Sequence, residues 1–258
     1  MKLGLEGKRA VVLGASKGIG RAIAGALAEE GCRVVLASRS RESAEKAAQS
    51  IGRGARGYAC DTGQLDQVDA LFEQASRDLG DIDIVLLNSG GPPAGPAMGV
   101  SSETWQRWFN AMFVGLVRMA DHALPGMIER RWGRIVNVIS SGVIQPIPNL
   151  GISNTIRPAL VGWAKSVSNE VAAHGVTVNS IAPGRIETER LGELDAANAK
   201  RQGRSVEEVA RESKARIPMG RYGTVDEFAA AAVFLMSDAA SYITGSIVRV
   251  DGGQISSI

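Results

Sequence analysis

Short apolar runs rich in valine, isoleucine and leucine recur along this chain, and longer amphipathic segments separate them. The runs are RAVVLG (9–14), RVVLAS (33–38), IDIVLLNSG (82–90), GRIVNVIS (133–140), VTVNSIAPG (176–184) and SIVRVDGG (246–253). Continuous apolar runs of this length are typical of strands buried on both faces, as in parallel sheets covered by helices. Because crossovers between parallel strands are right-handed, the pattern predicts an α/β fold with one doubly wound parallel sheet.

The size and composition of the chain favour a single domain over residues 1–258. Apolar residues make up 45% and charged residues 22%, which are ordinary globular values, and no Pro/Ser-rich linker divides the chain. The one long interruption is the charged, amphipathic segment 189–217, which follows a strand end. Two interpretations of this segment stay open: a helical excursion on the surface, or a lid over a ligand.

Several classes of protein are disfavoured by what the sequence lacks. No apolar run has the length of a membrane span, and the N-terminus shows no signal peptide, so we expect a cytoplasmic protein. Two cysteines, Cys32 and Cys60, and two histidines show no metal-ligand spacing, so we expect no structural metal. The net charge is only +2, and the basic cluster ERRWGR at 129–134 fits a solvated turn better than a nucleic-acid surface.

The first apolar run leads into a glycine-rich turn and then into a helical pattern, VVLGASKGIGRAIAGALAEEG. Gly14, Gly18 and Gly20 have GxxxGxG spacing, which lets the backbone turn tightly and lets a pyrophosphate approach the amides of a helix N-terminus. The spacing matches neither GxGxxG nor the P-loop, so a purely structural turn remains an alternative.

The end of the second run indicates which dinucleotide would bind. An NAD site requires a carboxylate there for the ribose 2′-hydroxyl, whereas an NADP site requires a cation for the 2′-phosphate. Here the residues are Ser38, Arg39, Ser40 and Arg41, with Lys17 in the glycine turn. The pattern therefore favours NADP(H), unless both arginines are only solvated loop charges.

Taken together, GASKGIG, CD at 60–61, LNSG at 87–90, GRIVNVISS, VNSIAPGRIET and ASYITGSIVRVDGG resemble the short-chain dehydrogenase/reductase family along nearly the whole chain. Bacterial 3-oxoacyl-(acyl-carrier-protein) reductases are the most similar group, and in particular a divergent subgroup that lacks the catalytic tyrosine and lysine. The resemblance implies a Rossmann-like fold, a small-molecule substrate, and a homotetramer or homodimer with the C-terminal VDGGQISSI near a subunit interface.

The resemblance also implies a set of cofactor contacts. Asp61 would face the adenine, Asn88 and Gly90 would line the adenine ribose, and Pro183 would begin the closure over the nicotinamide. The implied cofactor-binding residues are Gly14, Ser16, Lys17, Gly18, Ile19, Gly20, Ser38, Arg39, Asp61, Thr62, Asn88, Gly90, Pro183, Gly184, Ile186 and Thr188.

The positions that resemble the family's catalytic residues are mostly changed. Ser140 matches the serine that binds the substrate oxygen, but thirteen residues later stands Ser153 in place of tyrosine, and four further stands Arg157 in place of lysine. Met112 stands where the family has asparagine. No tyrosine lies between 59 and 221, so no shift of register restores the proton donor.

The replacements suit binding better than proton transfer. A serine hydroxyl is a poor general acid, and arginine effectively never gives up its proton. Arg157 can instead offer a fixed charge and a forked donor to a ribose, a phosphate or a carboxylate.

Pro158 leaves the local geometry of this stretch open. A helix that starts late, with Thr155 as N-cap, would separate Ser153 from Arg157. A helix that starts earlier and bends at Pro158 would stack the two side chains one turn apart.

Three functions fit these observations. The first is an NADP(H)-dependent oxidoreductase acting on a carbonyl or alcohol, with Ser140 on the reacting oxygen and a proton from water, a lid side chain or the substrate. The second is a non-catalytic NADP(H)-binding sensor or scaffold. The third, a lyase of the halohydrin-dehalogenase kind, is disfavoured because that group needs its tyrosine and gives up the dinucleotide glycines that this chain keeps.

Overall fold

A seven-stranded parallel sheet forms the centre of the computed structural model, which describes residues 2–257. The strands are β1 (Arg9–Val12), β2 (Arg33–Ser38), β3 (Arg56–Ala59), β4 (Ile84–Leu87), β5 (Gly133–Val138), β6 (Val176–Pro183) and β7 (Ile247–Val250). Their order is β3-β2-β1-β4-β5-β6-β7, and Val12 of β1 is in register with Leu36 of β2 and Leu86 of β4. The predicted doubly wound parallel sheet is confirmed, and its order reverses beside β1.

Strand β3 is the one strand that the apolar pattern did not predict. Its sequence is RGYA, and it lies at an edge of the sheet, where its side chains are only partly buried. At Gly57 an added Cβ would lie 2.3 Å from the Ala44 carbonyl carbon, so a helix packs directly on the strand backbone. A short, half-exposed edge strand gives no continuous apolar run, which explains why it was missed.

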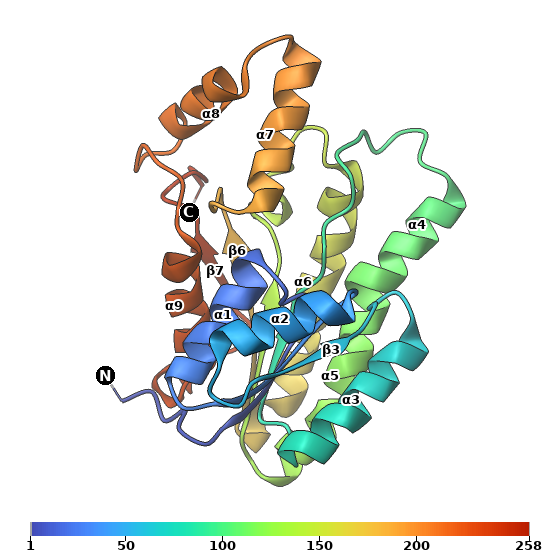
Figure 1. Ribbon diagram of the computed structural model, residues 1–258, viewed down its shortest axis with the longest axis vertical. Helices are drawn as coiled ribbons and strands as arrows, with labels where there is room; N and C mark the ends of the chain where they lie inside the picture. The colour runs from blue at the N-terminus through green and yellow to red at the C-terminus, as the bar shows by residue number, and fades with distance from the viewer. Residues whose placement is uncertain (1, 258) are drawn as a thin grey trace.

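Helices cover both faces of the sheet (Figure 1). One apolar core joins the sheet to α1 (Gly18–Glu29), α2 (Arg41–Ile51) and α9 (Val225–Leu235). The other joins it to α3 (Leu65–Leu79), α5 (Gly115–Glu129) and α6 (Gly151–Val171). Each fully buried leucine, isoleucine or phenylalanine in these cores contributes about 1.5–3 kcal/mol relative to exposure, so the sheet is a rigid platform for whatever binds at its strand ends.

A π-helical turn over Asn110–Val114 separates α4 (Ser102–Phe109) from α5. Thr62, just beyond β3, donates its hydroxyl proton to the Ala111 carbonyl at 2.8 Å. At Gly115 an added Cβ would approach the Thr62 carbonyl oxygen to 1.8 Å, so this position admits only glycine. Single π turns are frequent at functional sites, and this one lies beside the strand ends that the sequence indicated.

Beyond the carboxyl ends of the strands stand α7 (Glu189–Gln202) and α8 (Val206–Ala215), as Figure 1 shows. Thr188 caps α7, and Ser205 with Glu208 forms a capping box on α8. The segment 189–217 is therefore largely helical, which fits both interpretations. Within residues 2–257, no helix combines the length and the apolar character needed to cross a bilayer.

Candidate functional site

Two adjoining cavities lie at the carboxyl ends of the strands. The outer cavity, about 940 Å³, is bounded by the ends of β2 and β3, and the inner cavity, about 420 Å³, lies between β5, β6, α6 and α7. Both are lined by Lys17, Arg39, Asn88, Ser89, Gly90 and Gly91. The two cavities therefore form one continuous groove across the point where the strand order reverses, which is where such sheets bind ligands.

The glycine turn forms the floor of this groove because only glycine fits its backbone. Gly14 and Gly18 have positive φ values of 61° and 57°, which disfavour any side chain. At Gly20 an added Cβ would lie 2.3 Å from the Gly14 carbonyl oxygen. Lys17 precedes α1 without a side-chain cap, so the first amides of α1 are free to bind an anion.

Asn88 ties the glycine turn to the end of β4. Its side-chain amide donates to the carbonyl oxygens of Leu13 at 3.3 Å and Gly14 at 3.0 Å. At Gly14 an added Cβ would meet the same amide at 2.7 Å. Asn88 thus lines both cavities, and it also holds the turn in place.

The cations at the end of β2 are not equivalent. Arg39 is exposed, lines both cavities and forms no ion pair within residues 2–257. Arg41 is instead paired with Glu45 at 2.8 Å on α2. Lys17 forms an ion pair with Glu189 of α7, a partner that the sequence gave no reason to expect. Arg39 is therefore the cation that this site offers freely to a phosphate.

The other predicted cofactor residues lie around the same groove. Ser16, Ser38, Asp61 and Thr62 line the outer cavity, and the Asp61 carboxylate accepts a hydrogen bond from the Gly63 amide at 2.9 Å. The inner cavity is lined by Gly18, Ile19, Gly20, Pro183, Gly184, Ile186 and Thr188. The structure thus brings together every residue that the resemblance assigned to a cofactor.

Ser89 is a candidate residue that the sequence analysis missed. Its hydroxyl is buried, has no hydrogen-bond partner within residues 2–257, and lies where the two cavities meet. A buried hydroxyl without a partner costs about 1–3 kcal/mol, so its position in a groove suits a ligand that supplies one. The glycine cradle, the free Arg39 and this orphan hydroxyl are together a good fit for a phosphorylated dinucleotide.

Ser140 lies two residues beyond β5 and lines the inner cavity. Its hydroxyl oxygen accepts a hydrogen bond from the Gly142 amide at 3.0 Å. Because this bond occupies an acceptor position, the hydroxyl proton stays available to a ligand oxygen.

Helix α6 begins at Gly151, so the interpretation with the earlier start is correct and the alternative with Thr155 as N-cap is wrong. The Thr155 hydroxyl donates to the Gly151 carbonyl within the helix at 2.9 Å. The early start is supported by close packing, since a Cβ at Gly151 would lie 2.4 Å from the Ala97 amide. Pro158 is accommodated inside α6, and Ser153 and Arg157 stack one turn apart.

Ser153 and Arg157 are both buried at the wall of the inner cavity, with 8% and 9% of their surface exposed. Arg157 donates from Nε to the Ser153 hydroxyl at 3.3 Å and from Nη1 to the Val138 carbonyl at 2.8 Å. Burial, together with the nearby charge of Arg190, lowers the pKa of the Arg157 guanidinium to about 10. The side chain therefore remains a cation at neutral pH and does not act as a proton donor.

Met112 is withdrawn from the cavity. It lies in the π-helical turn with only 1% of its surface exposed and packs with Ile152 and Ile156 of α6. Asn110, two residues earlier, lines the outer cavity and not the inner one, and its side-chain oxygen accepts a hydrogen bond from Gln106 at 2.8 Å. Neither Asn110 nor Met112 therefore lines the inner cavity.

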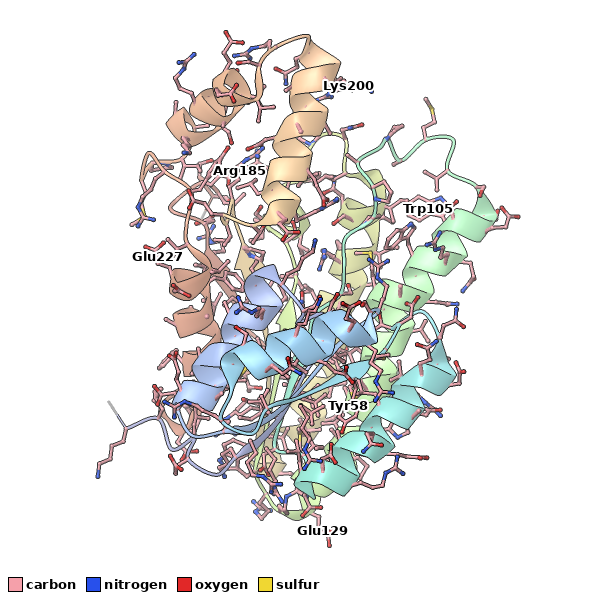
Figure 2. The ribbon with its side chains drawn as sticks, viewed as in Figure 1. Tyr58, Trp105, Glu129, Arg185, Lys200 and Glu227 are labelled. Atoms are coloured by element: carbon pink, nitrogen blue, oxygen red, sulfur yellow. The ribbon has the colours of Figure 1, made fainter. Side chains whose placement is uncertain are left out.

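The first turn of α7 lines the inner cavity and makes contacts on two sides of it. Glu189 contacts Lys17 of the glycine turn, and Arg190 donates to the Pro92 carbonyl at 2.5 Å. Deeper in the segment, Arg185 pairs with Asp195 at 2.8 Å, which fixes α7 against the end of β6. Figure 2 shows Arg185 beside α7, with Lys200 at the far end of that helix.

Comparison with known proteins agrees with this geometry. A family model described as enoyl-(acyl carrier protein) reductase matches residues 14–254. The 3-oxoacyl-(acyl-carrier-protein) reductase FabG of Vibrio cholerae is 34% identical over 254 residues, which cover 98% of this chain and 99% of the relative. The chain belongs to the short-chain dehydrogenase/reductase family.

Solved structures of short-chain reductases superpose closely on the chain. L-Sorbose reductase from Gluconobacter frateurii, complexed with NADPH and L-sorbose, has a TM-score of 0.94 and 31% identity, and each chain is fully covered. A single-residue variant of actinorhodin polyketide ketoreductase, solved with NADPH, has a TM-score of 0.91 and 30% identity, covering 96% of this chain and 97% of its own. These NADPH-bound neighbours support the prediction of an NADP(H) site.

Other parts of this short-chain dehydrogenase/reductase site were beyond sequence reasoning. Arg190 and Pro92 are 98 positions apart, and Lys17 and Glu189 are 172 apart. No sequence motif joins the two members of either pair. Ser89 carried the one usable signal, since it stands inside LNSG directly after a predicted strand.

Proposed function

We propose that this chain is an NADP(H)-dependent oxidoreductase that acts on a carbonyl or alcohol without the family's tyrosine and lysine. The proposal is carried by one observation: the glycine turn and Ser140 line the same inner cavity. A nicotinamide bound there would exchange a hydride with the substrate carbon while Ser140 holds the substrate oxygen.

The proposed residue roles follow from where the residues lie in the groove and, for Ser140, Ser153 and Arg157, from their hydrogen bonds. Gly14, Gly18 and Gly20 would hold the pyrophosphate, and Arg39 the 2′-phosphate. Ser140 would donate its hydroxyl proton as a hydrogen bond to the substrate oxygen, stabilising the negative charge that develops during reduction. Neither Ser153 nor Arg157 is a suitable acid, so the proton that completes the alcohol comes from water.

The electron balance is that of a carbonyl reduction. The substrate carbon would gain a hydride supplied by bound NADPH, which would leave as NADP⁺, and the substrate oxygen would gain one proton. In this scheme Ser153, Arg157 and Met112 replace the tyrosine, lysine and asparagine of a degenerate tetrad, and they belong to substrate binding or packing.

We further propose that residues 1–258 act as one dinucleotide-binding domain, with 189–217 as a lid. Its support is that α7 lines the inner cavity and contacts the glycine turn. A homotetramer or homodimer is also expected from the family, and sedimentation equilibrium measures it directly.

Transfer of deuterium from [4-²H]NADPH to a panel of aldehydes, ketones and oxo acids tests the oxidoreductase. Deuterated alcohol should form, and Ser140→Ala should slow its formation about 100-fold, because it removes a donor to the developing oxyanion. Tight NADPH binding with no deuterium transfer across the panel would instead establish the alternative, a non-catalytic NADP(H)-binding sensor or scaffold.

A further inference from the structure

Arg157 is a buried cation without a carboxylate partner in residues 2–257. Of the other arginines that line the inner cavity, Arg185 pairs with Asp195 at 2.8 Å and Arg190 with Glu193 at 3.3 Å. Arg39 has no carboxylate partner within residues 2–257, but it is exposed to solvent. Among residues 2–257, the acceptors that Arg157 contacts are one hydroxyl and one carbonyl, although just 9% of its surface is exposed. Burying an unpaired charge is costly, and such charges in proteins are normally matched by an opposite charge.

The Ser153–Arg157 pair offers donors to the cavity. A guanidinium has five N–H groups, and the bonds to Ser153 and Val138 use one on Nε and one on Nη1. Nη2 makes no hydrogen bond to residues 2–257, and Arg157 lines the inner cavity. Since the Ser153 oxygen already accepts from Arg157, its own proton is free to point outward.

The surrounding charges would not repel an anion at this place. The acidic residues in the wall of the inner cavity are Glu189 and Glu193, and each is in contact with a cation, Lys17 or Arg190. Arg190 is also near enough for its charge to act on Arg157. The Arg157 corner therefore carries an excess of positive charge.

We propose that Ser153 and Arg157 form a subsite for a carboxylate group of the substrate. A planar fork of N–H donors with an adjacent hydroxyl matches the two oxygens of a carboxylate, whereas a neutral ribose diol would leave the buried charge uncompensated. The inference rests on the proposed function, because it places the reacting oxygen on Ser140 and the carboxylate on Arg157.

This arrangement defines the substrate class as an oxo acid, or the corresponding hydroxy acid in the reverse direction. Ser140 and Ser153 line the same 420 Å³ cavity, so the carbonyl and the carboxylate belong to one small molecule. The redox step is unchanged: the carbonyl carbon gains a hydride, its oxygen gains a proton from water, and the carboxylate is neither made nor broken.

Calorimetric titration of the NADP⁺ complex with unreactive probes tests the subsite. The probes are acetate, malonate and oxamate, with the neutral oxamide as control. Oxamate should bind at least about 10-fold more tightly than oxamide. Arg157→Met should weaken oxamate about 30-fold, whereas oxamide and NADP⁺ should change less than about 2-fold.

Two further variants separate charge from geometry. Arg157→Lys keeps the charge but loses the fork, so oxamate should weaken about 5-fold. Arg201→Met removes an exposed arginine from α7 outside the inner cavity and should leave every affinity unchanged. Circular dichroism melts check that each variant is folded. If Arg157→Met does not fold, the comparison of Arg157→Lys with the wild type tests the subsite instead.

Two results would overturn the subsite. One is that Arg157→Met weakens NADP⁺ as much as it weakens oxamate, which would assign the side chain to the cofactor ribose. The other is that none of the three carboxylates binds the wild-type complex. Arg157-dependent carboxylate binding without deuterium transfer to any carbonyl would support the subsite and overturn only the proposed oxidoreductase.

Discussion

The two ends of the groove are built in different ways. At the glycine turn, a Cβ on Gly14 or Gly20 would collide with Asn88 or with the turn itself, so the shape of the site is a property of the backbone. At the other end, Ser140, Ser153 and Arg157 shape the inner cavity with their side chains. Changing a backbone cradle disturbs the fold, whereas changing three side chains leaves the sheet intact. This difference explains how the glycine turn can be kept while serine and arginine stand at positions 153 and 157.

Reversing the free charge at the nucleotide end should have the largest effect. Arg39→Asp should weaken NADPH about 300-fold and leave NADH nearly unchanged, because only NADPH has a 2′-phosphate to repel. Fluorescence titration measures both affinities. The matched control is Arg41→Asp, two positions away, whose charge is already paired with Glu45. Equal losses in the two variants would contradict the assignment of Arg39.

Introducing the family's tyrosine and lysine at positions 153 and 157 tests whether the inner cavity lacks only these two side chains for family-type catalysis. The double variant Ser153→Tyr with Arg157→Lys should reduce neutral ketones about 100-fold faster than the wild type, because a positioned acid contributes that much. The rate of NADPH oxidation measures it. Each single change alone should raise the rate of NADPH oxidation only slightly. If the double variant is as slow as the single ones, the geometry around the side chains has diverged too.

Substitutions of Met112 test how much the apolar packing around this side chain stabilises the fold. Met112→Asn should lower the free energy of unfolding by about 2 kcal/mol, because it buries an amide among Ile152 and Ile156 without a partner. Urea denaturation measures this loss, and the control Met112→Leu should cost less than about 1.5 kcal/mol. An asparagine variant as stable as the wild type would mean that the amide finds partners, and that this position could readily revert.

Removing the ion pair between Lys17 and Glu189 should have the smallest effect on NADPH affinity. Glu189→Gln removes the carboxylate that contacts Lys17 across the groove, and Lys17 is then free to attract a phosphate. NADPH should bind about 3-fold more tightly, since exposed ion pairs are weak. Repeating the titration at high salt is the control, because the difference should shrink there. Weaker binding would show that the contact helps to hold the cofactor.

The sheet was largely predictable, because five of its strands are largely buried on both faces and read as continuous apolar runs. The sixth predicted strand, β7, lies half-exposed at the sheet edge but still has the apolar pattern IVRV. Strand β3 was not predictable, since its RGYA sequence is stabilised by its place at the sheet edge under α2 and not by apolar content. The same distinction holds for the site. Gly14 and Gly20 are readable because their spacing encodes a backbone shape that only glycine permits.

The unpredictable part of the site depends on contacts between distant segments. The bond from Arg190 to the Pro92 carbonyl and the pair formed by Lys17 and Glu189 exist only once α7 has packed over the strand ends. The start of α6 at Gly151 likewise depends on packing against Ala97, which overrides the local preference of proline for the first turn of a helix.

Pro158 has a further consequence for local unfolding around the site. A proline inside a helix supplies no N–H to the carbonyl four residues earlier, which here belongs to Asn154. The backbone ladder of α6 is therefore interrupted directly after the turn that holds Ser153 and Arg157. Local unfolding follows such breaks, so amide hydrogens before Pro158 should exchange with solvent through openings that leave the remainder of α6 and the sheet closed. We therefore expect Ser153 and Arg157 to belong to a cooperative unit that is smaller and less stable than the one that contains the glycine turn.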